Sequence, residues 1–155
     1  ITEDGSLDVS NNVLKQLDIV VASVHSGFKN TKEKMTKRMI KAMQNPNVDI
    51  IAHPTGRLIT KREAYEIDLD LVFAEAKKTK TVMEINSYPE RMDLKDIHVK
   101  SAVKAGVKLA ISTDAHNSDH LNFINLGIGT ARRGWATKDD IINTRSLKNM
   151  LSMLK

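Results

Sequence analysis

The sequence predicts an α/β fold built around a mostly parallel sheet. Four short apolar segments alternate along the 155 residues with segments whose apolar side chains recur at helical spacing. Strands that alternate with helices form βαβ units, and such units build parallel sheets or barrels. In addition, polar side chains able to do chemistry follow each predicted strand directly. The length suits a single domain.

The first two predicted strands cover residues 18–24 and 48–52. The first is short and apolar on both faces, which favours a fully buried strand. Between them, residues 29–41 carry six lysines and arginines, while Met35, Met39 and Met43 recur at helical spacing. This run predicts an amphipathic helix with a solvated basic face, and a phosphate-binding patch is the less favoured alternative.

The second half of the chain continues the alternation. Strands are predicted over residues 81–86 and 107–111, and helices over about 68–78, about 94–105 and about 146–154. Asp68 is a candidate N-cap for the first of these helices, and Gly106 ends the second.

The composition is that of an ordinary soluble globular protein, with 41% hydrophobic and 28% charged residues. Cysteine is absent, which excludes disulfides and thiolate metal ligands. Lysine and arginine number 24 against 19 acidic residues, a mildly basic balance that suits an anionic substrate such as nucleic acid. The apolar stretches are too short to span a membrane, and nothing resembles a signal peptide, so a cytoplasmic location is expected. Because the chain opens on Ile1 without methionine, we expect a fragment of a longer protein.

Histidine and aspartate side chains follow three of the predicted strands, at the end where α/β proteins place their active sites. Imidazole and carboxylate suit zinc, manganese or iron. Asp114 and His116 are two residues apart, so both point to one face of an extended segment. A lone histidine at a strand end is more often simply hydrogen-bonded, but three with an aspartate favour a metal site. The predicted ligands are His25, His53, Asp114 and His116.

Two arginines lie in the strand-end loops. Arg57 and Arg91 are candidates for binding phosphate oxygens in a fork, although surface arginines are common and an ordinary surface role is equally open. Glu84, inside the third strand, is expected to be a buried carboxylate bonded to a neighbouring group.

Two histidines and the single tryptophan have less specific surroundings. His98 lies within a predicted helix and His120 in a polar loop, so both are expected to be structural or exposed. Trp135 follows two arginines and is a candidate for stacking on a base, although a single tryptophan more often anchors a core.

The strand-end motifs, in this order, resemble the PHP family, the polymerase and histidinol phosphatase domains. The flanking segments are similar to the PHP domain fused behind bacterial and archaeal family X DNA polymerases. The resemblance implies the C-terminal portion of a distorted (β/α)7 barrel, with residues 1–155 forming the C-terminal part of a single PHP domain. The matching motifs are residues 21–26, 51–57, 84–86 and 112–116, and the matching flanks are residues 4–8, 89–94 and 131–135.

The resemblance also implies a trinuclear-type site of divalent metals, zinc or manganese. His25 and His53 would hold one metal, Asp114 a second and His116 a third. The family's site further needs a His-x-His pair, additional ligands and a bridging glutamate, which we expect upstream of Ile1. The isolated chain is therefore expected to hold only part of the site.

The leading functional hypothesis is metal-dependent hydrolysis of DNA phosphodiester bonds, as a 3′-to-5′ exonuclease or 3′-end-processing activity fused to a repair polymerase. One alternative is a free-standing PHP phosphatase acting on a small phosphomonoester such as histidinol phosphate. Another is a non-catalytic module that stabilises a polymerase. No membrane partner is expected, whereas an opened barrel should expose an edge strand and favour self-association.

Overall fold

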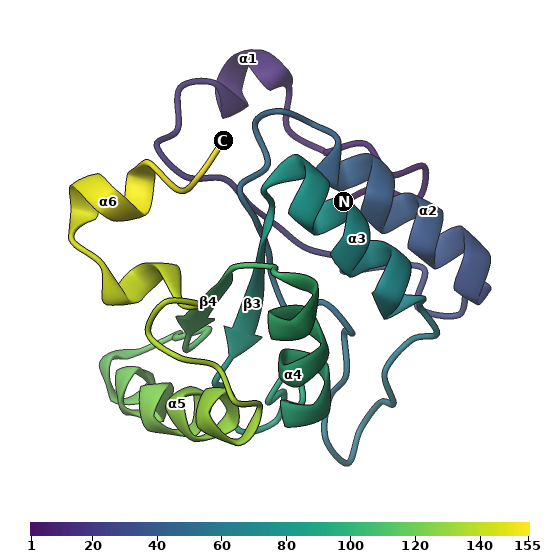
Figure 1. The fold of residues 1–155 in the computed structure, drawn as a ribbon. Coiled ribbons are helices and arrows are strands. Elements are labelled where there is room, and N and C mark those ends of the chain that lie inside the picture. The colour runs from purple at the N-terminus through teal and green to yellow at the C-terminus, as the bar shows by residue number, and fades with distance from the viewer.

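A parallel sheet of four strands forms the centre of the molecule (Figure 1), and the computed structural model describes all residues from 1 to 155. The strands lie side by side in chain order, each parallel to the next. The predicted α/β class with parallel strands is therefore confirmed. The strands are β1 (Val21–Ala22), β2 (Ile50–Ile51), β3 (Val82–Asn86) and β4 (Leu109–Ser112).

Three helices cover one face of this sheet: α2 (Lys32–Met43), α3 (Leu69–Thr79) and α4 (Asp96–Ala105) (Figure 1). Each follows one strand and precedes the next, as the predicted βαβ units require. The methionines predicted to line the buried side of α2 are fully buried in the main core. Asp68 caps α3 as predicted, since its side chain accepts a hydrogen bond from the backbone N–H of Leu71 at 3.2 Å.

The opposite face is covered only in part. The short helices η2 (Ile142–Thr144) and α6 (Leu147–Leu151) lie over the amino-terminal half of the sheet, where Ile142 and Leu154 pack with Val82. A hydrogen bond holds the C-terminus against the sheet there, because the backbone N–H of Lys155 donates to Asp49 Oδ1 at 3.2 Å. A tail helix predicted over residues 146–154 is present, but it covers only Leu147–Leu151.

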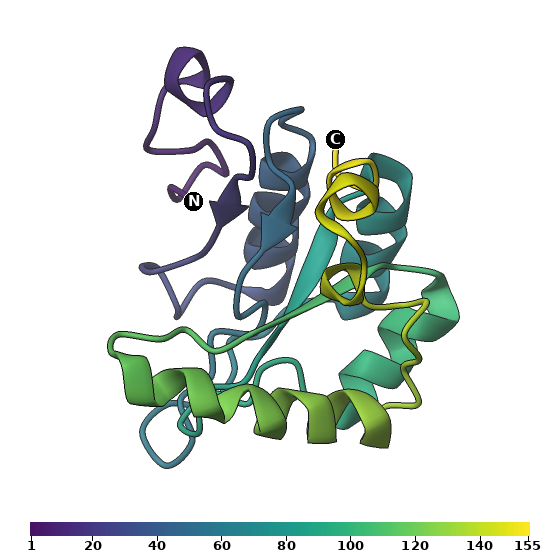
Figure 2. The same ribbon diagram turned by 90° about the vertical axis from the view of Figure 1, so that its left-hand side faces the viewer.

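A further pair of helices, η1 (Ser118–Phe123) and α5 (Ile124–Arg133), runs across the carboxyl end of the sheet (Figure 2). Neither was predicted from the sequence, nor was the four-residue helix α1 (Asn11–Leu14). Gly127 lets α5 approach β3, since a Cβ at this position would lie 2.0 Å from Ser87 Oγ. No helix combines the length and the apolar character needed to cross a membrane.

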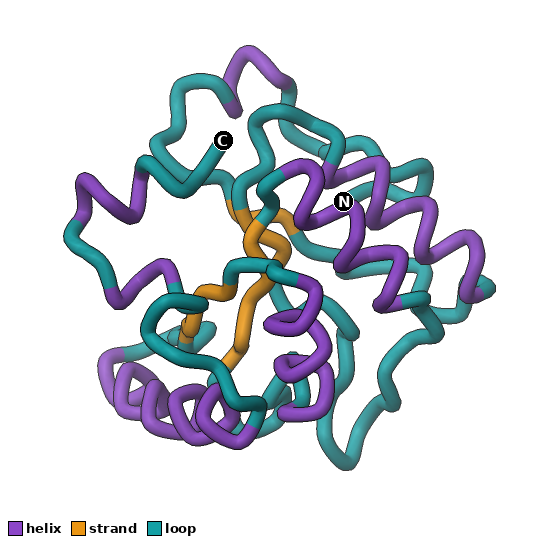
Figure 3. Tube along the Cα trace, in the orientation of Figure 1, coloured by secondary structure: helices purple, strands orange, loops and turns teal.

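The first strand differs from the prediction. Only two of the seven residues expected to be extended and buried form β1, and Val21 is 55% exposed. The strands are the orange segments of Figure 3, and β1 forms one edge of their sheet. At this edge Ala22 is buried in the main core, whereas the face that carries Val21 is open to solvent. The expectation of full burial on both faces was wrong, and self-association through this edge remains a prediction.

Candidate active site

A buried carboxylate joins the ends of three strands. Glu84 of β3 accepts a hydrogen bond from the backbone N–H of His53, which follows β2, at 2.5 Å. It also accepts from the hydroxyl of Ser112, at the end of β4, and from Asn86 Nδ2 at 3.2 Å. The prediction that Glu84 is a buried, hydrogen-bonded carboxylate is confirmed. Its role is to fix the positions of three strand ends relative to one another.

The alternation of β3 explains why a carboxylate lies there. Met83 and Ile85 face the helices and belong to the main core, so Glu84 and Asn86 point to the opposite face. Burial raises the pKa of Glu84, and the hydrogen bonds from Ser112 and from the His53 backbone oppose this rise only in part.

Two of the predicted metal ligands lie together at this edge. The imidazole rings of His25 and His53 stack with their centroids 5.4 Å apart. Burial, helped by the charge of Arg91, lowers the pKa of His53 to about 4, so this imidazole is neutral at physiological pH. Its Nδ1 is buried and has no hydrogen-bond partner. A neutral imidazole with an unsatisfied nitrogen is the form in which histidine binds metals.

The third predicted ligand, Asp114, follows β4 and lies near enough to His53 for the two charges to interact. Its Oδ2 accepts from Arg91 Nε at 2.9 Å and from Asn86 Nδ2 at 3.2 Å, whereas Oδ1 accepts no hydrogen bond within the chain. Burial alone would raise the pKa of Asp114, but the hydrogen bond from Asn86 and the charge of Arg91 outweigh it and lower the pKa. Asp114 is therefore an ionised carboxylate with one free oxygen.

The fourth predicted ligand, His116, is exposed and faces a different set of neighbours. Its Nδ1 lies 2.7 Å from the carbonyl oxygen of Asp114, and its ring lies 6.3 Å from that of His120. His120 belongs to η1 rather than to a loop, and it is only half-buried. No pattern in the sequence indicates that His120 lies beside the candidate site.

The donor atoms of these residues are of the type that divalent metals bind, but too few of them converge on one point. No three histidine, aspartate or glutamate side chains are arranged to hold a metal ion by themselves. His25, His53 and Asp114 nevertheless offer nitrogen and oxygen donors along one edge of the sheet, with His53 neutral and Asp114 ionised. A metal site formed by these residues and His116 remains a prediction.

The two arginines differ in their contacts. Arg57 donates from Nε to the carbonyl of Arg91 at 2.6 Å and from Nη2 to the carbonyl of Met92. It therefore holds in place the loop that carries Arg91. Arg91 itself uses only Nε, toward Asp114, which leaves its terminal nitrogens without partners in the chain. Phosphate binding by either arginine remains a prediction, and Arg91 is the better placed of the two.

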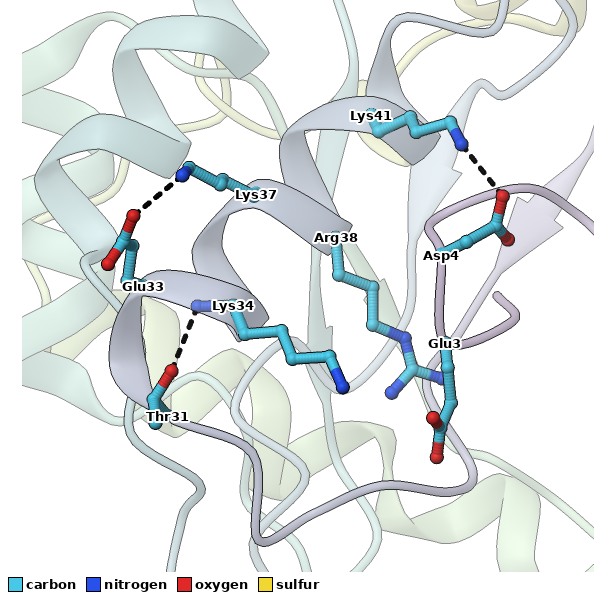
Figure 4. A pocket seen from close by; sticks show the side chains of 8 residues that line it. All are labelled: Glu3, Asp4, Thr31, Glu33, Lys34, Lys37, Arg38 and Lys41. Atoms are coloured by element: carbon cyan, nitrogen blue, oxygen red, sulfur yellow. Dashed lines mark hydrogen bonds and ion pairs between the residues drawn. The ribbon is translucent and has the colours of Figure 1, made fainter.

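The basic helix α2 lines a separate cavity of about 450 Å³ (Figure 4). Two of its basic side chains are paired with carboxylates there: Lys37 with Glu33 at 2.6 Å, and Lys41 with Asp4 at 2.8 Å. This pairing favours the predicted solvated face over a phosphate-binding patch. Arg38 does not belong to that face, because its side chain is buried and donates to the carbonyl of Ser26 at 2.8 Å.

The other two residues singled out from the sequence lie away from these strand ends. His98 is half-buried within α4, as expected of a structural histidine. Trp135 is 74% exposed, so it does not anchor a core, and Lys100 Nζ lies 5.7 Å from the centre of its ring.

The fold and the site together define an α/β protein whose polar residues converge at the carboxyl edge of a parallel sheet. Comparison with known proteins narrows this class to a family. The whole chain is 46% identical to the DNA polymerase/3′-5′ exonuclease PolX of Bacillus subtilis, of which it spans 27%. It is 33% identical over 151 residues to a probable phosphatase of Thermoanaerobacter, covering 92% of this chain and 59% of that protein. A probable phosphatase of Caldanaerobacter subterraneus is 37% identical over 123 residues, 74% of this chain and 46% of that protein.

No family model matches the chain. The individual relatives are therefore the evidence for the family. They are a DNA polymerase/3′-5′ exonuclease and several probable phosphatases, which are the proteins expected from the sequence motifs. These matches confirm the predicted resemblance to the PHP family and to its representatives in family X DNA polymerases.

Proposed function

We propose that this chain is part of a metal-dependent phosphoesterase that hydrolyses phosphodiester bonds of DNA. The activity would be that of a 3′-to-5′ exonuclease or 3′-end-processing enzyme, fused to a family X polymerase that acts in DNA repair. Residues 1–155 would form the C-terminal part of a single PHP domain. The observation that carries the proposal is the neutral, buried His53 beside His25 and ionised Asp114, in a chain 46% identical to PolX over its whole length.

The chain's own residues prepare this site in three ways. His25, His53, Asp114 and His116 would hold zinc or manganese, up to three ions in the intact site, and bound metal would supply a water of lowered pKa and polarise the phosphate. The remaining ligands would come from outside these 155 residues. Burial keeps the His53 imidazole unprotonated, and the hydrogen bond from its backbone to Glu84 fixes where the ring stands.

Arg91 supports the same proposal from the substrate side. Its guanidinium already lies against Asp114, and its terminal nitrogens are free to bind two oxygens of a phosphate. A fixed positive charge at this position would stabilise negative charge that develops on the phosphate during hydrolysis. Arg57 would act indirectly, because it holds the carbonyls of the loop that carries Arg91.

The test compares hydrolysis of single-stranded DNA by the full-length protein, with manganese added, among wild type, His53→Ala and Asp114→Asn. Removal of a metal-binding group costs more than the 10- to 100-fold typical of an outer hydrogen-bond partner, so we expect losses of about 100-fold or more. Glu66→Ala changes an exposed carboxylate away from the site and serves as the control. Unchanged turnover in both site variants would refute the assignment.

A second candidate function is that of a phosphatase acting on a small phosphomonoester such as histidinol phosphate. It is favoured by the matches to probable phosphatases at 33% and 37% identity. Parallel assays on single-stranded DNA and on small phosphomonoesters would separate the two activities. Metal analysis of the full-length protein addresses the remaining candidate, a non-catalytic module, which would contain no bound metal.

A further inference from the structure

Beside the candidate hydrolytic site lies a cluster of three aromatic side chains that the proposed chemistry does not use. We propose that Tyr88, His120 and Phe123, here called the aromatic platform, stack against a nucleobase of the DNA strand whose phosphate is hydrolysed. This inference deepens the proposed function and rests on it, because it names the part of the substrate that the site would recognise next to the phosphate.

The rings of the aromatic platform contact one another closely. His120 and Phe123 stack with centroids 5.1 Å apart and planes inclined by 26°. Tyr88 meets both edge-on, at 5.3 Å from His120 and 5.7 Å from Phe123. All three side chains are half-buried, and the neighbouring Leu121 is 61% exposed. The cluster therefore presents ring and aliphatic surface to solvent instead of forming a closed core.

Hydrogen bonds fix the aromatic platform to the candidate site. The backbone N–H of Tyr88 donates to Asn86 Oδ1 at 2.9 Å, and the amide nitrogen of the same Asn86 side chain donates to Asp114. On the other side, the backbone N–H of His116 donates to His120 Nδ1 at 3.2 Å. The platform is thus joined on one side to Asn86, which hydrogen-bonds to Asp114, and on the other to His116, which follows Asp114 by two residues. A substrate phosphate bound by Arg91 beside Asp114 would bring its own nucleoside to these rings.

Aromatic residues are scarce in this chain, which makes their grouping informative. Only 4% of the residues are Phe, Trp or Tyr, yet one of two tyrosines, one of three phenylalanines and one of five histidines meet here. Aromatic side chains in single-strand binding sites stack on bases with little sequence preference, because every base has a π face. A partner of this chemistry, an unpaired nucleobase beside a phosphodiester, is also what a 3′-end nuclease must hold.

The experiment measures binding of short single-stranded DNA to the full-length protein by fluorescence anisotropy. One oligonucleotide has an intact 3′-terminal nucleotide, and its partner lacks only that base. Wild type should bind the intact strand on the order of tenfold more tightly than the strand that lacks the base. Tyr88→Leu should lose most of this preference. Tyr88→Trp and Tyr88→Phe, which retain an aromatic ring, should keep it. Leu71→Ala, which changes an exposed apolar residue of α3, is the control and should behave as wild type.

Each outcome decides between the platform and a purely structural cluster. Loss of the base preference in Tyr88→Leu, with rescue by Tyr88→Trp, supports stacking even if the leucine variant is less stable. Equal binding of intact and abasic strands by wild type, or a preference that Tyr88→Leu and Phe123→Leu both retain, overturns the inference. Turnover measured on the same strands tests the proposed function separately: base-dependent binding without hydrolysis would refute the hydrolytic assignment and leave the platform standing.

Discussion

The candidate site has a buried half and an exposed half, although both follow strands of one sheet. His53 is only 5% exposed and Glu84 only 6%, and hydrogen bonds join them to each other and to β4. His25 and His116 are exposed, and the ring nitrogens of each make one polar contact, with an atom of the same segment. The contrast teaches that contacts within the chain fix the buried half in place, whereas few contacts within the chain hold the exposed half.

The strongest test of this contrast is Glu84→Ala. The substitution removes the common acceptor of three donors, leaves the His53 N–H unpaired in a buried position and opens a cavity. Each such loss is costly, so we expect the free energy of unfolding to fall by on the order of 4 kcal/mol. Urea denaturation measures it, with exposed Glu66→Ala as the control. A change below about 1 kcal/mol would mean that Glu84 does not hold the strand ends together.

Asp93 hydrogen-bonds to the loop that follows His53, and its ionisation should make the stability of the protein depend on pH. Its Oδ2 accepts from the backbone N–H of Thr55 at 2.9 Å, while Oδ1 is buried without a partner. Burial raises the pKa of Asp93 from 3.8 to about 6, despite the opposing hydrogen bonds from Thr55. A raised pKa means that the stabilisation is complete below pH 4 and is lost as pH rises through about 6.

The rise in the pKa of Asp93 corresponds to a decrease of about 3 kcal/mol in the free energy of unfolding as the pH rises from about 4 to above about 6. Asp93→Asn cannot ionise and can still accept from Thr55, so it should flatten this part of the stability profile. Urea denaturation of both proteins from pH 4 to pH 7.5 is the measurement. Parallel profiles in wild type and variant would show that Asp93 does not titrate in this range.

The smallest effect on stability should come from the exposed half. His116→Ala removes an exposed imidazole, so we expect the free energy of unfolding to change by no more than about 0.5 kcal/mol. If His116 binds metal, manganese-dependent hydrolysis should nevertheless fall by about tenfold or more. Measuring unfolding and turnover on one preparation separates the two effects. A destabilised variant with normal turnover would reverse the assignment of this half.

Much of the fold could be predicted because local patterns and tertiary packing agree in it. The spacing of Met35, Met39 and Met43 predicts the buried side of α2, and the alternation within β3 predicts that Glu84 turns away from the helices. The extent of β1 could not be predicted in this way. The apolar pattern of residues 18–24 does not tell which face another element covers, and Val21 lies at an open edge.

The helix α5 and the aromatic platform escaped prediction for a related reason. Ile124–Arg133 contains Gly127 and Gly129, which weaken a helix in isolation, and its stability comes from packing against the sheet. This packing requires Gly127, because a Cβ at that position would lie 2.0 Å from Ser87 Oγ. The platform joins Tyr88 to Phe123 across 35 positions of sequence, so no local pattern marks it.

The strand order of the sheet has a consequence for how the chain folds. Every strand pairs with its immediate neighbour in sequence, so each new pairing closes only one strand–helix unit. Short closures keep the entropy lost before each pairing small, and the sheet can grow one unit at a time. The bond between Asp49 and Lys155 spans 106 positions and has to form late. We therefore expect the segment in which Ile142 and Leu154 cover Val82 to pack last, after the strands beneath it have assembled.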